Sequence, residues 1–183
     1  SGVARVLVRA GKLNATAAEA LVKSAAERKA SFVSALIAAG SVSPADLAHT
    51  LSNALALPLL DLNAVDLQKL PRNIVDAKTA SQFQIVVLGK RGNRLFIGAA
   101  DPTDQEAVER IKFATQLTPE WVIVEYDKLM RQLEVRGLVR RLQFEDDLRV
   151  KPVRLTPKGA RLIEAAMAEA IGLTGDWLKS ALD

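Results

Sequence analysis

Few residues in this chain are of a type that could carry out chemistry. The 183 residues include one histidine, His49, and no cysteine, so a thiol nucleophile, a disulfide and a Cys or multi-His metal site are all excluded. The only basic glycine segment, residues 89–94, lacks the spacing of a phosphate-binding loop, whose backbone N–H groups and lysine must surround the phosphates. Asp101 and Asp104 are paired carboxylates at a predicted helix start, where capping accounts for them. We therefore expect no enzymatic activity from this chain.

The composition is that of a folded globular chain. Lys and Arg number 25 against 21 Asp and Glu, 49% of the residues are hydrophobic and 25% are charged, which argues against wholesale disorder. A transmembrane helix needs about 20 consecutive, mainly apolar residues, and no stretch meets that requirement. We therefore expect a cytoplasmic protein without a transmembrane segment.

An internal repeat with an offset of 29 residues organises the first third of the chain, because residues 36–43 repeat the pattern of residues 7–14. Gly11 and Gly40 stand where a helix would end, since glycine enters the left-handed conformation at little cost. Asn14 and Ser43 follow as caps for the next helix. Each copy is thus predicted to be a helix, a glycine turn and a second helix, so the two copies would form a four-helix unit.

A different pattern begins after this repeat. Residues 84–88 and 94–99 are apolar, β-branched or aromatic runs on either side of a Gly- and Asn-containing turn, which indicates a β-hairpin. Around the hairpin we expect an extended segment at 57–62, a helix at about 72–81, a helix that starts within residues 101–104 and runs to about Thr115, a strand at 121–124 and a helix from about Asp127. This succession predicts an α+β sandwich.

The expected fold class is therefore α+β, in three parts. Residues 1–56 would form the helical repeat unit, and residues 57–134 a small α/β sandwich with a three- to four-stranded sheet. Residues 135–183 would add a basic, wing-like hairpin and C-terminal helices.

Residues 3–134 resemble the N-terminal domain of type IV pilus assembly ATPases of the PilB type and of the related type II secretion ATPases. The resemblance is carried by Leu57-Pro58 before residues 60–62, by the hairpin at 90–98 and by Asp101-Pro102-Thr103-Asp104 with the helix behind it. It implies an MshEN module, a regulatory and assembly domain. The partner it implies is a PilZ-type adaptor or the inner-membrane platform of the pilus, which would also bring the protein to the membrane periphery.

In some members of that family the helical repeat binds cyclic di-GMP. The positions of this chain that retain the family pattern are Leu7, Arg9, Gly11, Leu36 and Gly40. The Arg-Leu-Gly positions are instead filled by residues 2–4 and 31–33, and the closing glutamines are replaced by Ala25 and Ala54. Arg5 and Arg9 could supply charge, but the lost amides would leave polar edges of a dinucleotide unpaired. No cofactor is expected, and cyclic di-GMP binding stands as an alternative.

The last quarter of the chain resembles the wing and following helix of MarR-type winged-helix regulators. Residues 134–161 contain eight Lys or Arg against four acids, and by this resemblance Arg149, Lys151 and Arg154 would contact DNA. A recognition helix should precede this wing, yet residues 121–130 follow the pilus pattern there. DNA binding through the tail is therefore a further alternative, and a basic hairpin that only packs on the domain is another.

Overall fold

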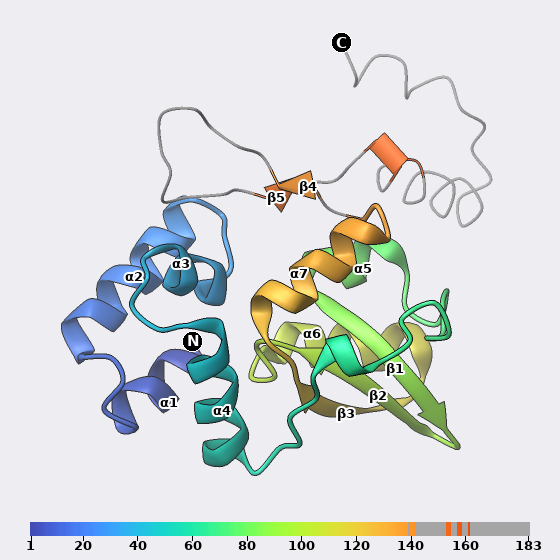
Figure 1. The fold of residues 1–183 in the computed structure, drawn as a ribbon, viewed down its shortest axis with the longest axis horizontal. Coiled ribbons are helices and arrows are strands. Elements are labelled where there is room, and N and C mark those ends of the chain that lie inside the picture. The colour runs from blue at the N-terminus through green and yellow to red at the C-terminus, as the bar shows by residue number, and fades with distance from the viewer. Residues whose placement is uncertain (139, 142–152, 155–156, 159–160, 162–183) are drawn as a thin grey trace.

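The computed structural model describes residues 1–138, 140–141, 153–154, 157–158 and 161. The first part is helical and forms one side of the molecule (Figure 1). Its helices are α1 (Gly2–Arg9), α2 (Ala15–Glu27), α3 (Phe32–Ala38) and α4 (Pro44–Leu55). Their order confirms the predicted repeat of helix, turn and helix.

The glycine turns and caps set the helix ends in both copies. Gly11 and Gly40 have φ values of 68° and 66°, a region that disfavours residues with a Cβ atom. The side chain of Asn14 accepts a hydrogen bond from the N–H of Ala17 at 2.7 Å, and Ser43 begins α4 in the same way. These local features fix the direction change between the helices of each pair.

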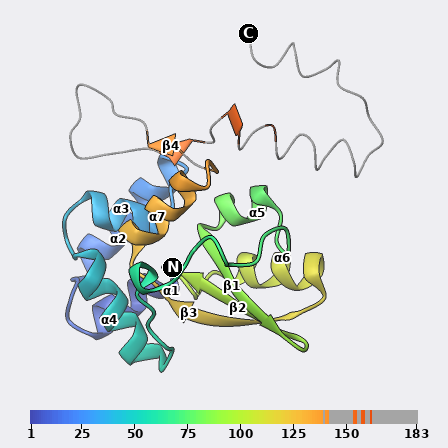
Figure 2. The same cartoon turned by 45° about the vertical axis from the view of Figure 1, so that its right-hand side comes forward.

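The second part is a three-stranded sheet with helices on both faces (Figures 1 and 2). Strand β1 pairs with β2 in antiparallel orientation, and β2 pairs with β3 in parallel orientation. Helix α7 covers one face, and α5 and α6 cover the other. The elements in chain order are η1 (Leu62–Ala64), α5 (Ala77–Gln82), β1 (Ile85–Arg91), β2 (Arg94–Ala99), α6 (Gln105–Thr115), β3 (Thr118–Ile123) and α7 (Tyr126–Val135). The α+β fold class is confirmed.

Two predicted boundaries in this part were wrong. The helix expected from residue 72 begins at Ala77, because Asn73 has a positive φ of 66° and the side chain of Asp76 caps the N–H of Thr79 at 2.9 Å. The strand expected at 121–124 begins earlier, at Thr118. It includes Pro119, which a strand tolerates at the edge of a sheet, where one side of its backbone has no strand partner.

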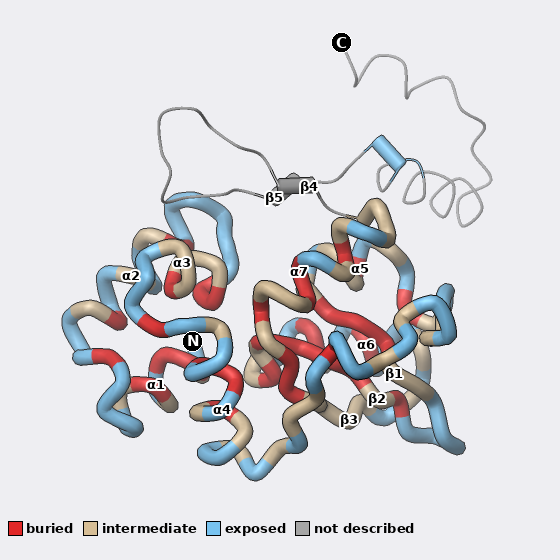
Figure 3. Tube along the Cα trace, in the orientation of Figure 1, coloured by how far each residue is buried: buried red, intermediate tan, exposed pale blue. Residues whose placement is uncertain are grey.

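A single core joins the helical unit to the sandwich. Fully buried residues of α1, α3 and α4 belong to one apolar cluster with residues of β1, β3 and α7. Figure 3 colours the buried residues red along the trace of the chain. This cluster includes Leu7, Leu36, Leu51, Val86 and Leu129. A second, smaller cluster lies between the sheet and α6 and includes Leu95, Ile97 and Ile111. Because the larger cluster spans both parts, the packing of the four helices is linked to that of α7.

The base of the expected C-terminal hairpin is present. Strands β4 (Arg140–Arg141) and β5 (Val153–Arg154) pair in antiparallel orientation. The helices expected beyond residue 161 lie outside the described residues. Within the described part of the chain, no helix combines the length and the hydropathy needed to cross a membrane.

Candidate functional site

The retained positions of the repeat motif fall into two groups. Leu7 and Leu36 have no exposed surface, so in this structure they serve the core. Gly11 and Gly40 lie in exposed turns, and the space where a Cβ would stand is open at both. Arg9 of this set lines a pocket.

That pocket has a volume of about 400 Å³. It lies between α1, the last turn of α4 and the loop that joins β2 to α6. Its lining is mainly apolar or small, apart from two arginines and one threonine, and consists of Gly2, Arg5, Val6, Arg9, Ala10, Ala54, Leu55 and Thr103. The turn of the second copy, at Gly40, does not contribute to it.

The two arginines give the pocket its charge. Arg5 and Arg9 stand four residues apart on α1 and therefore on one helix face. Neither takes part in an ion pair with another described residue. Two guanidinium groups beside apolar walls can hold an anionic ligand, because charge-assisted hydrogen bonds are the strongest available to a side chain. No Asn or Gln lines the pocket, so amide recognition of a base edge is not provided there by a side chain.

The sandwich side of the pocket is held by Asp101. Its Oδ1 accepts hydrogen bonds from the N–H of Thr103 at 2.9 Å and from the hydroxyl of Thr103 at 2.6 Å. Burial raises the pKa of Asp101, while the bonds from Thr103 oppose that shift. Asp104 is the helix cap, accepting from Glu106 and Ala107 at the start of α6. Asp104 therefore caps the helix as expected, whereas Asp101 does not cap it and instead bonds to Thr103 in the preceding turn.

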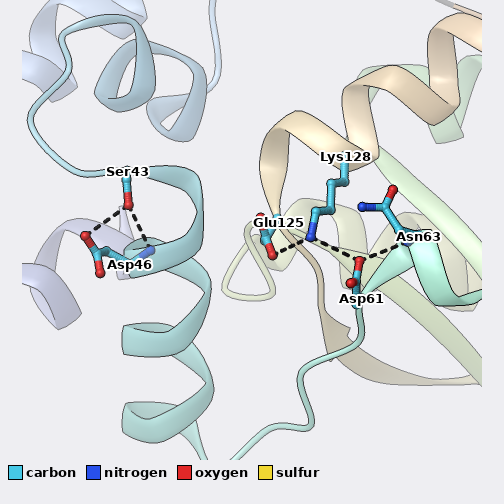
Figure 4. A network of polar contacts seen from close by, with 6 residues as sticks. All are labelled: Ser43, Asp46, Asp61, Asn63, Glu125 and Lys128. Carbon is cyan, nitrogen blue, oxygen red and sulfur yellow. Dashed lines mark hydrogen bonds and ion pairs between the residues drawn. The ribbon is translucent and has the colours of Figure 1, made fainter.

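A polar network attaches the segment after α4 to the first turn of α7 (Figure 4). Lys128 Nζ lies 3.0 Å from Asp61 Oδ1 and 2.8 Å from Glu125 Oε1. The hydrogen bonds that Lys128 donates to Glu125 and then to Asp61 raise the pKa of Lys128. The hydrogen bonds that Asp61 accepts from the N–H of Asn63 and then from Lys128 lower the pKa of Asp61. Because Asp61 and Lys128 are 67 residues apart, the network ties the exit of the helical unit to the sandwich.

A second polar contact joins the two parts near α3. The hydroxyl of Ser31 caps α3 and also donates to Gln84 Oε1 at 3.0 Å, across 53 residues of sequence. Gln84 has a φ of 51° immediately before β1. Together with the shared core, these contacts fix the helical unit against the sheet.

The DNA-contact candidates can be placed only in part. Arg149 and Lys151 lie outside the described residues. Arg154 lies in β5, opposite Arg140 of β4. The interpretation of this segment as a wing that contacts DNA stays a prediction.

The described residues contain no group of three or more His, Cys, Asp or Glu that could hold a metal ion. His49 is exposed on α4. Sequence reasoning did not identify Leu55 and Thr103 as pocket residues. Their types carry no chemical signal, and they reach the pocket from elements far apart in the chain.

Comparison with known proteins shows which family and which proteins this chain is similar to. Residues 55–135 match the model of the MshEN domain. The chain is 35% identical over 129 residues to the type IV pilus assembly ATPase PilB of Pseudomonas aeruginosa strain PAO1. That match covers 70% of this chain and 23% of PilB, so the chain spans about a quarter of its curated relative.

Two solved structures share the fold. The N-terminal domain of XpsE matches with a TM-score of 0.57 and 25% identity, covering 72% of this chain and 91% of that one. A structure of MshE with cdg matches with a TM-score of 0.53 and 24% identity, covering 73% of this chain and 96% of that one. The likeness to MshE shows the fold alone.

Proposed function

Residues 55–135 belong to the MshEN domain family and are homologous to part of the N-terminal region of type IV pilus assembly ATPases, and from this we propose that the chain is the regulatory docking domain of such a motor. It binds a cytoplasmic protein partner, a PilZ-type adaptor or the inner-membrane platform of the pilus. This role places it in the cytoplasm, at the periphery of the inner membrane through its partners.

The observation that carries this proposal is the core shared by the two parts. Side chains of α1, α3 and α4 pack in the same cluster as Leu129, Met130 and Leu133 of α7. A partner that shifts the four helices must therefore also act on α7, because close-packed cores transmit displacement with little compression. The Lys128 network adds a polar connection between the same regions. A domain built this way can pass a docking event to the sandwich.

Isothermal titration calorimetry tests the docking proposal. The chain is titrated with a purified PilZ-type adaptor and, separately, with the cytoplasmic part of the platform. Saturable heat with at least one of them is expected. An absence of heat with partners that do bind the full-length motor would refute the proposal.

We also propose that the chain itself does not hydrolyse ATP. Its sequence contains no loop of the form G-x-x-x-x-G-K-[ST], and residues 89–94 prove to be the turn between β1 and β2 with the adjoining strand ends. Incubation with ATP and Mg²⁺ should release no phosphate above the protein-free blank. Release that scales with chain concentration would contradict this.

Cyclic di-GMP binding is the second candidate, favoured by the pocket that Arg5 and Arg9 line. The likeness of the fold to MshE, whose structure was solved with cdg, agrees with a ligand of this class. A thermal shift with the dinucleotide tests it, since a ligand that binds only the folded state raises its melting temperature. The shift should vanish in Arg5→Ala and persist in Lys23→Ala, an exposed cation on α2.

A further inference from the structure

Basic residues from several elements gather at the C-terminal end of α7. Arg136 is partly buried there, and its Nη2 donates to the backbone oxygen of Leu67 at 3.3 Å. Burial and then the charge of Arg72 lower the pKa of Arg136, so Arg72 lies close enough for the two cations to repel each other. Lys158 reaches the same place, because a Cβ on Gly137 would stand 3.0 Å from its Cδ. Three cations distant in sequence therefore meet at one end of the molecule.

The base of the C-terminal hairpin follows α7 in the chain, and Arg140 of β4 pairs there with Arg154 of β5 through the backbone. None of the ion pairs between described residues involves Arg72, Arg136 or Lys158. As far as the described residues go, the positive charge of these three side chains is therefore available to an external anion.

An exposed aliphatic residue precedes Arg136 in the chain. Val135, next to Arg136 at the end of α7, is 75% exposed and is one of the few large apolar residues at the surface of the described chain. Leu138, just beyond it, packs only partly against the core. The basic end, defined as Arg72, Val135, Arg136 and Lys158, therefore combines cations with apolar surface.

We propose that the basic end binds an anionic lipid surface. Cations beside exposed apolar side chains favour binding at a membrane surface, because the charges contact the lipid headgroups while the apolar group enters the boundary between headgroups and acyl chains. The DNA backbone attracts only the cations, so DNA binding would give Val135 no role. The surface is independent of protein docking and would bring the domain to the membrane without a partner.

Vesicle co-sedimentation tests this. The chain should pellet with phosphatidylcholine vesicles that contain phosphatidylglycerol, stay in solution with pure phosphatidylcholine, and be released as salt increases. Each cation near an anionic surface contributes about fivefold in binding, so the variant Arg72→Gln/Lys158→Gln should bind about 25-fold more weakly. Val135→Ser should weaken binding severalfold without changing its salt dependence.

The matched control is Lys12→Gln/Lys23→Gln, which removes two exposed cations from the first copy of the helical repeat and should leave vesicle binding unchanged. All substituted side chains are exposed, and thermal melts of the variants should match that of the unaltered chain. Equal pelleting with neutral vesicles, an equal loss in the control variant, or binding to duplex DNA without binding to anionic vesicles would overturn the proposal.

Discussion

Replacing Gly98 with alanine should destabilise the protein through overpacking at the α7 face of the sheet. Gly98 lies in the central strand, and a Cβ at this position would stand 2.9 Å from Val86 Cγ1 and 3.2 Å from Val124 Cγ1. Forcing extra methyl groups into a packed core costs about 1–3 kcal/mol. Replacing glycine also restricts the unfolded chain, which raises the free energy of unfolding by about 0.4–1 kcal/mol. The net loss in unfolding free energy should therefore be about 1–2 kcal/mol by urea denaturation.

The control for this substitution is Gly89→Ala in the neighbouring strand. Apart from its chain neighbours, no atom lies within 4 Å of the position that a Cβ would take on Gly89, so this variant should be neutral or up to about 1 kcal/mol more stable. Val86→Ala removes the methyl group that the new Cβ at position 98 would meet, so the double variant should lose less stability than the sum of the two single variants. Equal stabilities of the Gly98 and Gly89 variants, or strict additivity with Val86→Ala, would refute the packing argument.

Three further substitutions probe the core, a cap and a buried acid. Leu36→Ala should cost about 2–5 kcal/mol, and circular dichroism and tryptophan fluorescence should report one coincident transition because the core is shared; separated transitions would contradict this. Asp104→Ala removes the cap of α6 and should cost about 1 kcal/mol in urea denaturation, whereas Asp104→Asn should cost less. The pKa of Asp101 is higher in the folded chain than in the unfolded chain, where it is 3.8. The carboxyl group of Asp101 therefore stabilises the folded state below pH 3.8, and this stabilisation is lost as the pH rises through the folded pKa. Asp101→Asn, whose Oδ1 can still accept from Thr103, should remove that dependence in a series of melts across this pH range; an unchanged profile would show that Asp101 is not its source.

Local signals in the sequence were sufficient for most elements of the fold. Gly11 and Gly40 predicted the two turns because their left-handed conformation is a property of the residue itself. Asn14 and Ser43 predicted the helix starts for the same local reason. Non-glycine residues in that conformation, such as Gln84, carry no such signal and depend on contacts made elsewhere.

The contacts between distant segments could not be predicted. The attachment of Lys128 to Asp61 and the contact of Lys158 with Gly137 depend on how the elements pack, which a single sequence does not specify. In the candidate pocket, Arg5 and Arg9 could be recognised as a source of charge. The opposite wall at Thr103 became visible only in the folded chain.

Competition for the partner tests the docking role most directly. A PilZ-type adaptor or the cytoplasmic part of the platform is immobilised and loaded with a full-length type IV pilus assembly ATPase that contains this domain. The isolated chain in excess should displace the motor, because the docking surface lies within it. No displacement by the chain, under conditions where unlabelled full-length motor does displace, would contradict the proposed function.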